Sequence, residues 1–139
     1  MARITVTAFI DASHCCKTKA AGWGMVLLTY PKDPGATYGG ALCLQGDSHD
    51  AEQTALVNGV TTLIEEADIC GKHVVVYADT EPDDRCGLTA RLMSHGASSA
   101  RIDYQRAHQG ARGALAGLHE RADRVAKQFM RESRDSRLA

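Results

Sequence analysis

The sequence predicts an α/β fold in which helices cover the faces of one five-stranded mixed sheet. Two observations lead to this fold class. Three strand-like segments joined by short connections fill the first third of the chain, which is typical of antiparallel strands. Helical and strand-like segments then alternate to the end, which is typical of strands reached through crossover helices. The predicted order of elements is β-β-β-α-β-α-β-α.

Alternation and turn residues predict the first three strands. Residues 3–12 alternate apolar and polar side chains, as a half-buried strand does. Residues 20–30 are rich in apolar side chains. Residues 36–46 form a third strand after the turn cluster PKDPG, and Gly39 and Gly40 suggest a bulge or bend within it.

A helix, a buried strand and a short helix are predicted next. Residues 49–68 repeat apolar side chains at helical spacing, and Gly71 suits the end of that helix. Residues 72–79 are nearly all apolar before a final Asp, as expected of a parallel strand buried on both faces. Residues 81–96 are predicted as a short helix with Pro82 in its first turn.

A strand and a helix complete the predicted fold. Residues 100–107 read as the fifth strand, and a Gly-bearing loop separates it from a closing helix at 115–133. Residues 134–139 are expected to form a frayed tail. Because no linker or repeat interrupts the chain, residues 1–139 are expected to form one domain.

The composition narrows the class of protein. Of the 139 residues, 44% are apolar, which is enough for a packed core. Five Cys without a C-x-x-C pair argue against a disulfide framework and a zinc site, so we expect reduced, mostly buried Cys in a cytoplasmic protein. Neither a signal peptide nor a membrane span is predicted. A monomer without an obligate protein partner is expected.

The charge is distributed unevenly along the chain. The net charge is −1, but residues 1–100 are net negative and residues 101–139 are net positive. This asymmetry favours a polyanionic partner for the C-terminal part, although a solvated helix face would also explain it.

Four acidic residues fall where a metal site would need them. Asp11 and Asp79 end two strands that are expected to be neighbours, where like charges repel unless a cation lies between them. Glu52 lies at the start of the first helix, and Asp123 lies on the apolar side of the last helix. Taken singly, each Asp could begin a turn and Glu52 could help to cap its helix.

Together, these acids predict a site for hard cations. Carboxylate oxygens suit Mg²⁺ or Mn²⁺. A Mg²⁺ site built from a few carboxylates is typical of phosphodiester hydrolysis by two metal ions.

Six short motifs, in order along the chain, resemble those of type I ribonuclease H. The resemblance extends over residues 4–127 and implies the ribonuclease H-like fold. The motifs are FIDAS, AAGWG, DAEQTAL, VVVYADT, AHQG and HERADRVA.

The resemblance implies an activity and a set of roles. Proteins of this family cut the RNA strand of RNA–DNA hybrids and leave 3′-hydroxyl and 5′-phosphate ends. The family's catalytic carboxylates, which bind two Mg²⁺ ions with Mn²⁺ as a substitute, correspond to Asp11, Glu52, Asp79 and Asp123. His108 resembles the family's loop histidine, which assists proton transfer or product release.

The chain also departs from the family pattern. His119 stands where the family often has Asn, and the family's basic protrusion has no counterpart. Ser13 is a candidate contact to the RNA 2′-hydroxyl, and Gln53 could face the minor groove. The substrate is expected to be held by basic residues near the C-terminus, namely Arg106, Arg112, Arg121, Arg124 and Lys127.

Other functions remain open from the sequence. A 3′–5′ exonuclease on this fold would carry Glu where Ser13 stands, and a resolvase would need an apolar surface for dimerisation that the sequence does not indicate. A non-catalytic nucleic-acid-binding domain is a further alternative, although a carboxylate cluster without metal would repel phosphate.

Overall fold

A computed structural model of the chain describes residues 4–29, 35–42, 46–104 and 114–138. Its strands lie in the order β3-β2-β1-β4-β5, with β1–β2 and β2–β3 antiparallel and β1–β4 and β4–β5 parallel. The predicted five-stranded mixed sheet and order of elements are confirmed. The strands are β1 (Thr5–His14), β2 (Ala21–Thr29), β3 (Ala36–Leu42), β4 (His73–Ala78) and β5 (Ser99–Tyr104).

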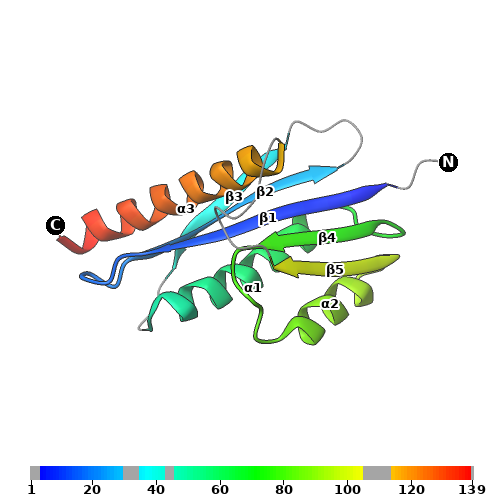
Figure 1. Ribbon diagram of the computed structural model, residues 1–139, viewed down its shortest axis with the longest axis horizontal. Coiled ribbons are helices and arrows are strands. Elements are labelled where there is room, and N and C mark those ends of the chain that lie inside the picture. Colours follow the sequence, from blue (N-terminus) through cyan, green and yellow to red (C-terminus); the bar gives the residue numbers. More distant parts are fainter. Residues whose placement is uncertain (1–3, 30–34, 43–45, 105–113, 139) are drawn as a thin grey trace.

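In the described parts of the chain, three helices add a layer on each face of the sheet, which gives three layers (Figure 1). One face of the sheet is covered by α1 (Ser48–Glu66) and α2 (Arg85–Ser94), and the other by α3 (Ala114–Leu138). The prediction ended the last helix at residue 133 and expected a frayed tail beyond it. The helix continues through that segment to Leu138, so its predicted end was too early.

The hydrophobic core is unequal on the two faces. The larger cluster packs the sheet against α1 and α2, and includes Ile10, Leu56 and Leu63. The smaller cluster under α3 is built around Phe9 and Ala122. No helix within the described residues is long and apolar enough to cross a membrane.

Glycines in β2 and β3 let α3 lie close to the sheet. A β-carbon at Gly22 would lie 2.4 Å from the backbone N of Met130, and one at Gly24 would lie 2.4 Å from the carbonyl of Ala122. A β-carbon at Gly39 would lie 2.5 Å from the carbonyl oxygen of Trp23 on the neighbouring strand β2 and 2.7 Å from Val125 Cγ1 of α3. The close approach of α3 therefore explains why these positions lack side chains.

Two sequence expectations about this region and the cysteines were wrong. The β2–β3 register runs without interruption through Gly39 and Gly40, so these residues form no bulge. The described cysteines are unpaired, but Cys16, Cys70 and Cys86 are exposed rather than buried. Their positions in turns and on the outer side of α2 keep them outside the core.

Candidate active site

Two aspartates lie next to each other on the neighbouring strands β1 and β4, at the same end of the sheet. Strands β1 and β4 run parallel, and Ile10 of β1 pairs with Ala78 of β4. Asp11 and Asp79 are the next residues on the two strands. Their carboxyl groups are close enough to interact electrostatically. The predicted adjacency of Asp11 and Asp79 is confirmed, but β1 continues past Asp11 to His14, so Asp11 does not end its strand as predicted.

A third carboxyl group joins them from α3. Because side chains alternate along a strand, Asp11 points to the same face of the sheet as Phe9, which α3 covers. On α3, Asp123 follows Ala122, which is fully buried against that face. Asp123 interacts with Asp11 through its charge and through a side-chain hydrogen bond, and with Asp79 through its charge. Asp11, Asp79 and Asp123 together form what we call the carboxylate cluster.

Burial and crowding change the protonation of the cluster. Burial first, then the charges of Asp79 and Asp123, raise the pKa of Asp11 from 3.8 to about 8. The backbone N–H of Ala12 donates to Asp11 Oδ1 over 2.8 Å and opposes this effect. The side chain is buried, with Asp11 only 8% exposed. Burial and the neighbouring charges therefore favour the protonated form of Asp11 when no cation is bound.

A histidine on α3 lies beside the cluster. Burial raises the pKa of Asp79, while the charge of His119 and a hydrogen bond with Asp11 act against that rise. The His119 ring meets Phe9 edge-on, with ring centroids 5.8 Å apart. Its Nε2 is buried and has no hydrogen-bond partner in the described part of the chain. The spacing of four residues between His119 and Asp123, one helical turn, was the sequence signal for this placement.

Glu52 is not a capping residue. Asp47 caps α1 by accepting from the N–H of Asp50 over 3.1 Å, and the carboxylate of Asp50 accepts from the N–H of Asp47 over 3.1 Å. Glu52 lies beyond this capping box, in the second turn, and is half-buried. No hydrogen bond or ion pair among the described residues uses its carboxylate or links it to the carboxylate cluster. Helix capping therefore does not explain why an acid stands at this position.

The residue after Glu52 connects α1 to the loop that follows Asp79. Gln53 Nε2 donates to the carbonyl of Glu81 over 3.0 Å, and Gln53 Oε1 accepts from the N–H of Asp83 over 2.9 Å. An ion pair of 2.9 Å between His49 and Asp83 reinforces the same connection. Both polar groups of the Gln53 amide are thus engaged within the protein. Contact of Gln53 with a nucleic-acid groove stays a prediction.

The carboxylate cluster, as it lies in this structure, does not form a complete set of metal ligands. Within the described ranges, no group of three or more His, Cys, Asp or Glu side chains is arranged to hold a metal ion. Two competitors for a cation are present, namely the proton on Asp11 and the ammonium group of Lys127, which pairs with Asp123 Oδ2 over 2.9 Å. The donor chemistry nevertheless fits Mg²⁺ or Mn²⁺, because carboxylate oxygens are their preferred ligands and a cation relieves the crowded negative charge.

The predicted substrate-binding residues differ in their placement. Ser13 follows Asp11 by two residues in β1 and is half-buried, on the same face of the sheet. The Arg121 guanidinium donates to the carbonyl of Gly35 over 3.2 Å, so this residue is engaged within the protein. Arg124 is exposed on α3. The remaining predicted residues, His108, Arg106 and Arg112, lie outside the described residues.

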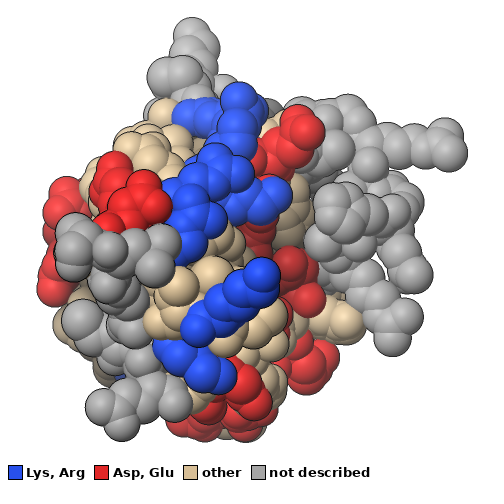
Figure 2. Space-filling view, turned by 90° about the vertical axis from the view of Figure 1, so that its left-hand side faces the viewer, with Lys and Arg blue, Asp and Glu red and all other residues tan. Residues whose placement is uncertain are grey.

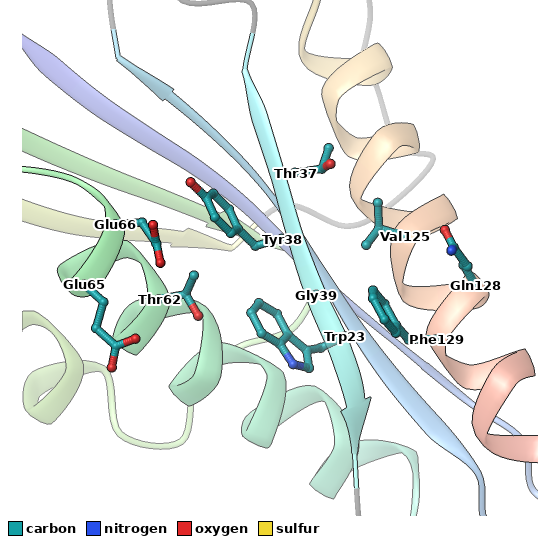
Figure 3. A pocket seen from close by; sticks show the side chains of 10 residues that line it. All are labelled: Trp23, Thr37, Tyr38, Gly39, Thr62, Glu65, Glu66, Val125, Gln128 and Phe129. Atoms are coloured by element: carbon teal, nitrogen blue, oxygen red, sulfur yellow. The ribbon is translucent and has the colours of Figure 1, made fainter. Parts of the chain in front are cut away.

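A pocket of about 540 Å³ lies at the other edge of the sheet (Figure 3). It follows the edge strand β3 and is lined by side chains from β2, β3, α1 and α3, among them Trp23, Tyr38 and Phe129. None of the carboxylates of the candidate site lines it. Trp23 also belongs to the larger core cluster and is only 8% exposed.

Comparisons with known proteins agree with this fold. No protein-family model and no curated protein matches the sequence. Many solved structures are similar to this chain, and three of them illustrate the similarity. The ribonuclease H1 of the halophilic archaeon Halobacterium salinarum NRC-1 is 16% identical, with a TM-score of 0.65 over 92% of this chain and 98% of that one.

Two further structures have similar scores. The N-terminal ribonuclease H domain of rv2228c from Mycobacterium tuberculosis, solved as a fusion with maltose-binding protein, is 18% identical, with a TM-score of 0.64 over 96% of this chain and 98% of that one. LC11-RNase H1 in complex with an RNA/DNA hybrid is 14% identical, with a TM-score of 0.66 over 96% of this chain and 99% of that one. The chain therefore has the ribonuclease H-like fold, as the sequence motifs predicted.

Proposed function

We propose that this protein is a metal-dependent endonuclease of the type I ribonuclease H kind. It hydrolyses the RNA strand of RNA–DNA hybrids and leaves 3′-hydroxyl and 5′-phosphate ends. The carboxylate cluster is the observation that carries this proposal. Its three acids are brought together by two parallel strands and a helix, and the pKa of Asp11 rises because burial and neighbouring negative charge disfavour its ionised form.

A cluster of this kind needs a functional reason. Burial and like-charge repulsion make its ionised form unfavourable in the folded protein. Ionisable groups whose pKa values are shifted by burial and specific neighbours gather at functional sites. A divalent cation would turn this unfavourable arrangement into a binding site.

Each residue has a proposed role. Asp11, Glu52, Asp79 and Asp123 would hold two Mg²⁺ ions, for which Mn²⁺ can substitute. When bound, these ions supply an activated water and stabilise charge at the scissile phosphate. Glu52 would join the other three acids from α1, which Gln53 ties by hydrogen bonds to the loop after Asp79.

The histidines have different proposed roles. His119, whose ring contacts Phe9 and whose charge acts on Asp79, would help to orient Asp79. His108, in the preceding loop, assists proton transfer or product release.

Further support comes from the comparisons and from Ser13. One of the three similar structures holds an RNA/DNA hybrid. Ser13 lies on the cluster's face of β1, where its hydroxyl could contact the 2′-hydroxyl that distinguishes RNA from DNA. We propose that the protein acts on the hybrid as a cytoplasmic monomer.

Cleavage of matched substrates tests the proposal. An end-labelled RNA–DNA hybrid is compared with duplex RNA, duplex DNA and the single strands, with Mg²⁺ and with chelator. We expect cutting of the hybrid's RNA strand in Mg²⁺ alone. Asp123→Asn should abolish it, whereas Asp135→Asn, an exposed acid on the same helix, should not. A protein that binds but never cuts any substrate would favour the non-catalytic alternative.

A further inference from the structure

Basic side chains form a stripe along α3. Arg124, Lys127, Arg131 and Arg134 recur at intervals of three and four residues, which places them on one side of the helix. By the same helical spacing, the stripe adjoins Asp123, with which Lys127 forms its ion pair. The stripe therefore starts at the carboxylate cluster and runs towards the C-terminal end of α3.

A second group of basic residues lies in the turn between β1 and β2. Lys17 and Lys19 are exposed there. The turn is ordered by hydrogen bonds from the N–H of Cys15 to the carbonyl of Ala20 and from the N–H of Lys19 to the carbonyl of Cys15, both 2.8 Å. Lys19 adopts a left-handed conformation with φ of 62°. The turn thus presents both lysines from a defined backbone.

The turn and the end of α3 lie side by side. Gly22, just after the turn, packs directly under the backbone of Met130. Hydrogen bonds with Thr18 lower the pKa of the Cys15 thiol, and the charge of Arg134 contributes in the same direction, which places Arg134 near the turn. Figure 1 shows the turn and the end of α3 at the same end of the molecule.

These residues gather at one end of the molecule. Figure 2 views this end of the molecule and shows Lys and Arg side chains in a band with acidic side chains on both sides. The side chains of Lys17, Lys19 and Arg131 form no ion pair among the described residues, and Arg134 has only a 3.4 Å contact with Asp135. We call Lys17, Lys19, Arg131 and Arg134 the hairpin–helix surface.

We propose that the hairpin–helix surface binds the phosphate backbone of the RNA–DNA hybrid on one side of the cleavage site. This inference rests on the proposed function. At about 1.5 Å per residue, Arg131 and Arg134 lie about 12 to 17 Å from Asp123 along the helix axis. A duplex rises about 3.4 Å per base pair, so the contacts fall about four to five base pairs from the scissile phosphate.

The shape of the band favours one strand of phosphates over a broad anionic surface. The acids on either side would repel a flat, negatively charged partner, whereas a backbone following the band avoids them. The surface also adds phosphate contacts to those predicted from the sequence, of which Arg121 is turned to Gly35.

Binding measurements with matched variants test the inference. All proteins carry Asp79→Asn so that the hybrid stays intact. We expect Arg131→Ala with Arg134→Ala, and separately Lys17→Ala with Lys19→Ala, to weaken hybrid binding on the order of tenfold and to reduce the salt slope by about 0.9 per lost contact. Lys72→Ala with Arg101→Ala, which removes basic residues remote from the band, should leave both quantities unchanged. Circular dichroism checks that each variant is folded.

A neutral phosphate locates the contact. A methylphosphonate about four to five nucleotides from the cleavage site should weaken binding by the parent protein but not by the Arg131→Ala/Arg134→Ala variant. If the variants bind with the parent's affinity and salt slope while wild-type protein cuts hybrids, the inference is overturned and the proposed function stands. Wild-type protein that neither binds nor cuts hybrids would instead overturn the proposed function and the inference with it.

Discussion

Asp11 and Asp79 extend from two parallel strands one residue beyond the paired Ile10 and Ala78, so their carboxyl groups share one end of the sheet. Among the described residues, no ion pair joins either carboxyl to a basic side chain of the sheet, and the pKa of each carboxyl is raised, chiefly by burial. The folded protein thus maintains an arrangement that disfavours its own ionised form. We assign the free-energy cost of holding these carboxyl groups together to the binding of a cation.

Stability should depend on pH in the metal-free protein. The pKa of Asp11 is about 8 in the folded chain and 3.8 in the reference state, so the folded chain binds more protons between these values. Stability therefore falls as pH rises from about 4 to 8. We expect the Tm in chelator to decrease over this range, and Asp11→Asn to have the higher Tm at the alkaline end.

Two other groups also lower the stability as pH rises, so the effect of Asp11 must be separated from theirs. Burial raises the pKa of Asp79, and the hydrogen bond with Asp83 raises that of His49. Asp11→Asn should therefore flatten the pH dependence without removing it. Mg²⁺ should raise the Tm of wild-type protein at about pH 8 and leave that of Asp11→Asn nearly unchanged. A variant less stable than wild type throughout would contradict this account and indicate a structural role for Asp11.

Gln53→Ala should impair catalysis from outside the cluster. The change removes the two hydrogen bonds that join α1 to the loop after Asp79, at a cost of about 1 kcal/mol each. Since Glu52 and Asp79 then lose their common register, we expect kcat to fall more than KM rises. Gln128→Ala, on the exposed side of α3, serves as the control. Loss of stability with an unchanged kcat would mean that Gln53 only supports the fold.

Lys127→Ala should strengthen metal binding. Its ammonium group competes with a cation for Asp123, but the pair is partly exposed, with side chains 48% and 37% accessible. Exposed pairs contribute about 0 to 1 kcal/mol, so the gain in Mg²⁺ affinity should be at most several-fold. Calorimetric titration without nucleic acid measures it, and Lys19→Ala controls for general charge. Weaker Mg²⁺ binding in Lys127→Ala would show that Lys127 supports the site rather than competes.

The two candidate histidines should differ in effect. If His108 assists proton transfer or product release, His108→Ala slows turnover without abolishing it, because bound metal ions provide most of the charge stabilisation. His119→Asn, which retains a polar side chain beside Asp79, should be tolerated better than His119→Ala. A His108→Ala variant with the wild-type rate would transfer the loop-histidine role to His119.

Local patterns predicted most of the fold, because hydrophobic periodicity directly reports which side of a strand or helix is buried. The strand ends at Asp11 and Asp79 could be placed together for the same reason, since crossover connections make β1 and β4 neighbours. Features that depend on contacts between elements were missed. Gly39 suggested a bulge, whereas it makes room for Val125 of α3. The hydrogen bond of Gln53 to a loop distant in the sequence was not predicted.

The end of α3 and the basic band also could not be predicted from local sequence patterns. The segment after residue 133 is polar and resembles a tail, but α3 continues through it. Lys17 and Lys19 are far in sequence from Arg131 and Arg134, and only the close packing of α3 over Gly22 brings the two pairs to one end of the molecule. The sequence therefore showed how many basic residues there are but not which of them lie together in the folded protein.

Titration with Mn²⁺ followed by NMR tests the central claim most directly, because a paramagnetic ion broadens signals only near its binding site. We predict that the amide signals of Ala12, Asp79 and Thr80 broaden first, that Mg²⁺ reverses the effect, and that Asp79→Asn loses it. Broadening centred on the exposed acids Glu65 and Glu66 at the end of α1, with Ala12 and Thr80 unaffected, would contradict the assignment of the carboxylate cluster as the metal site.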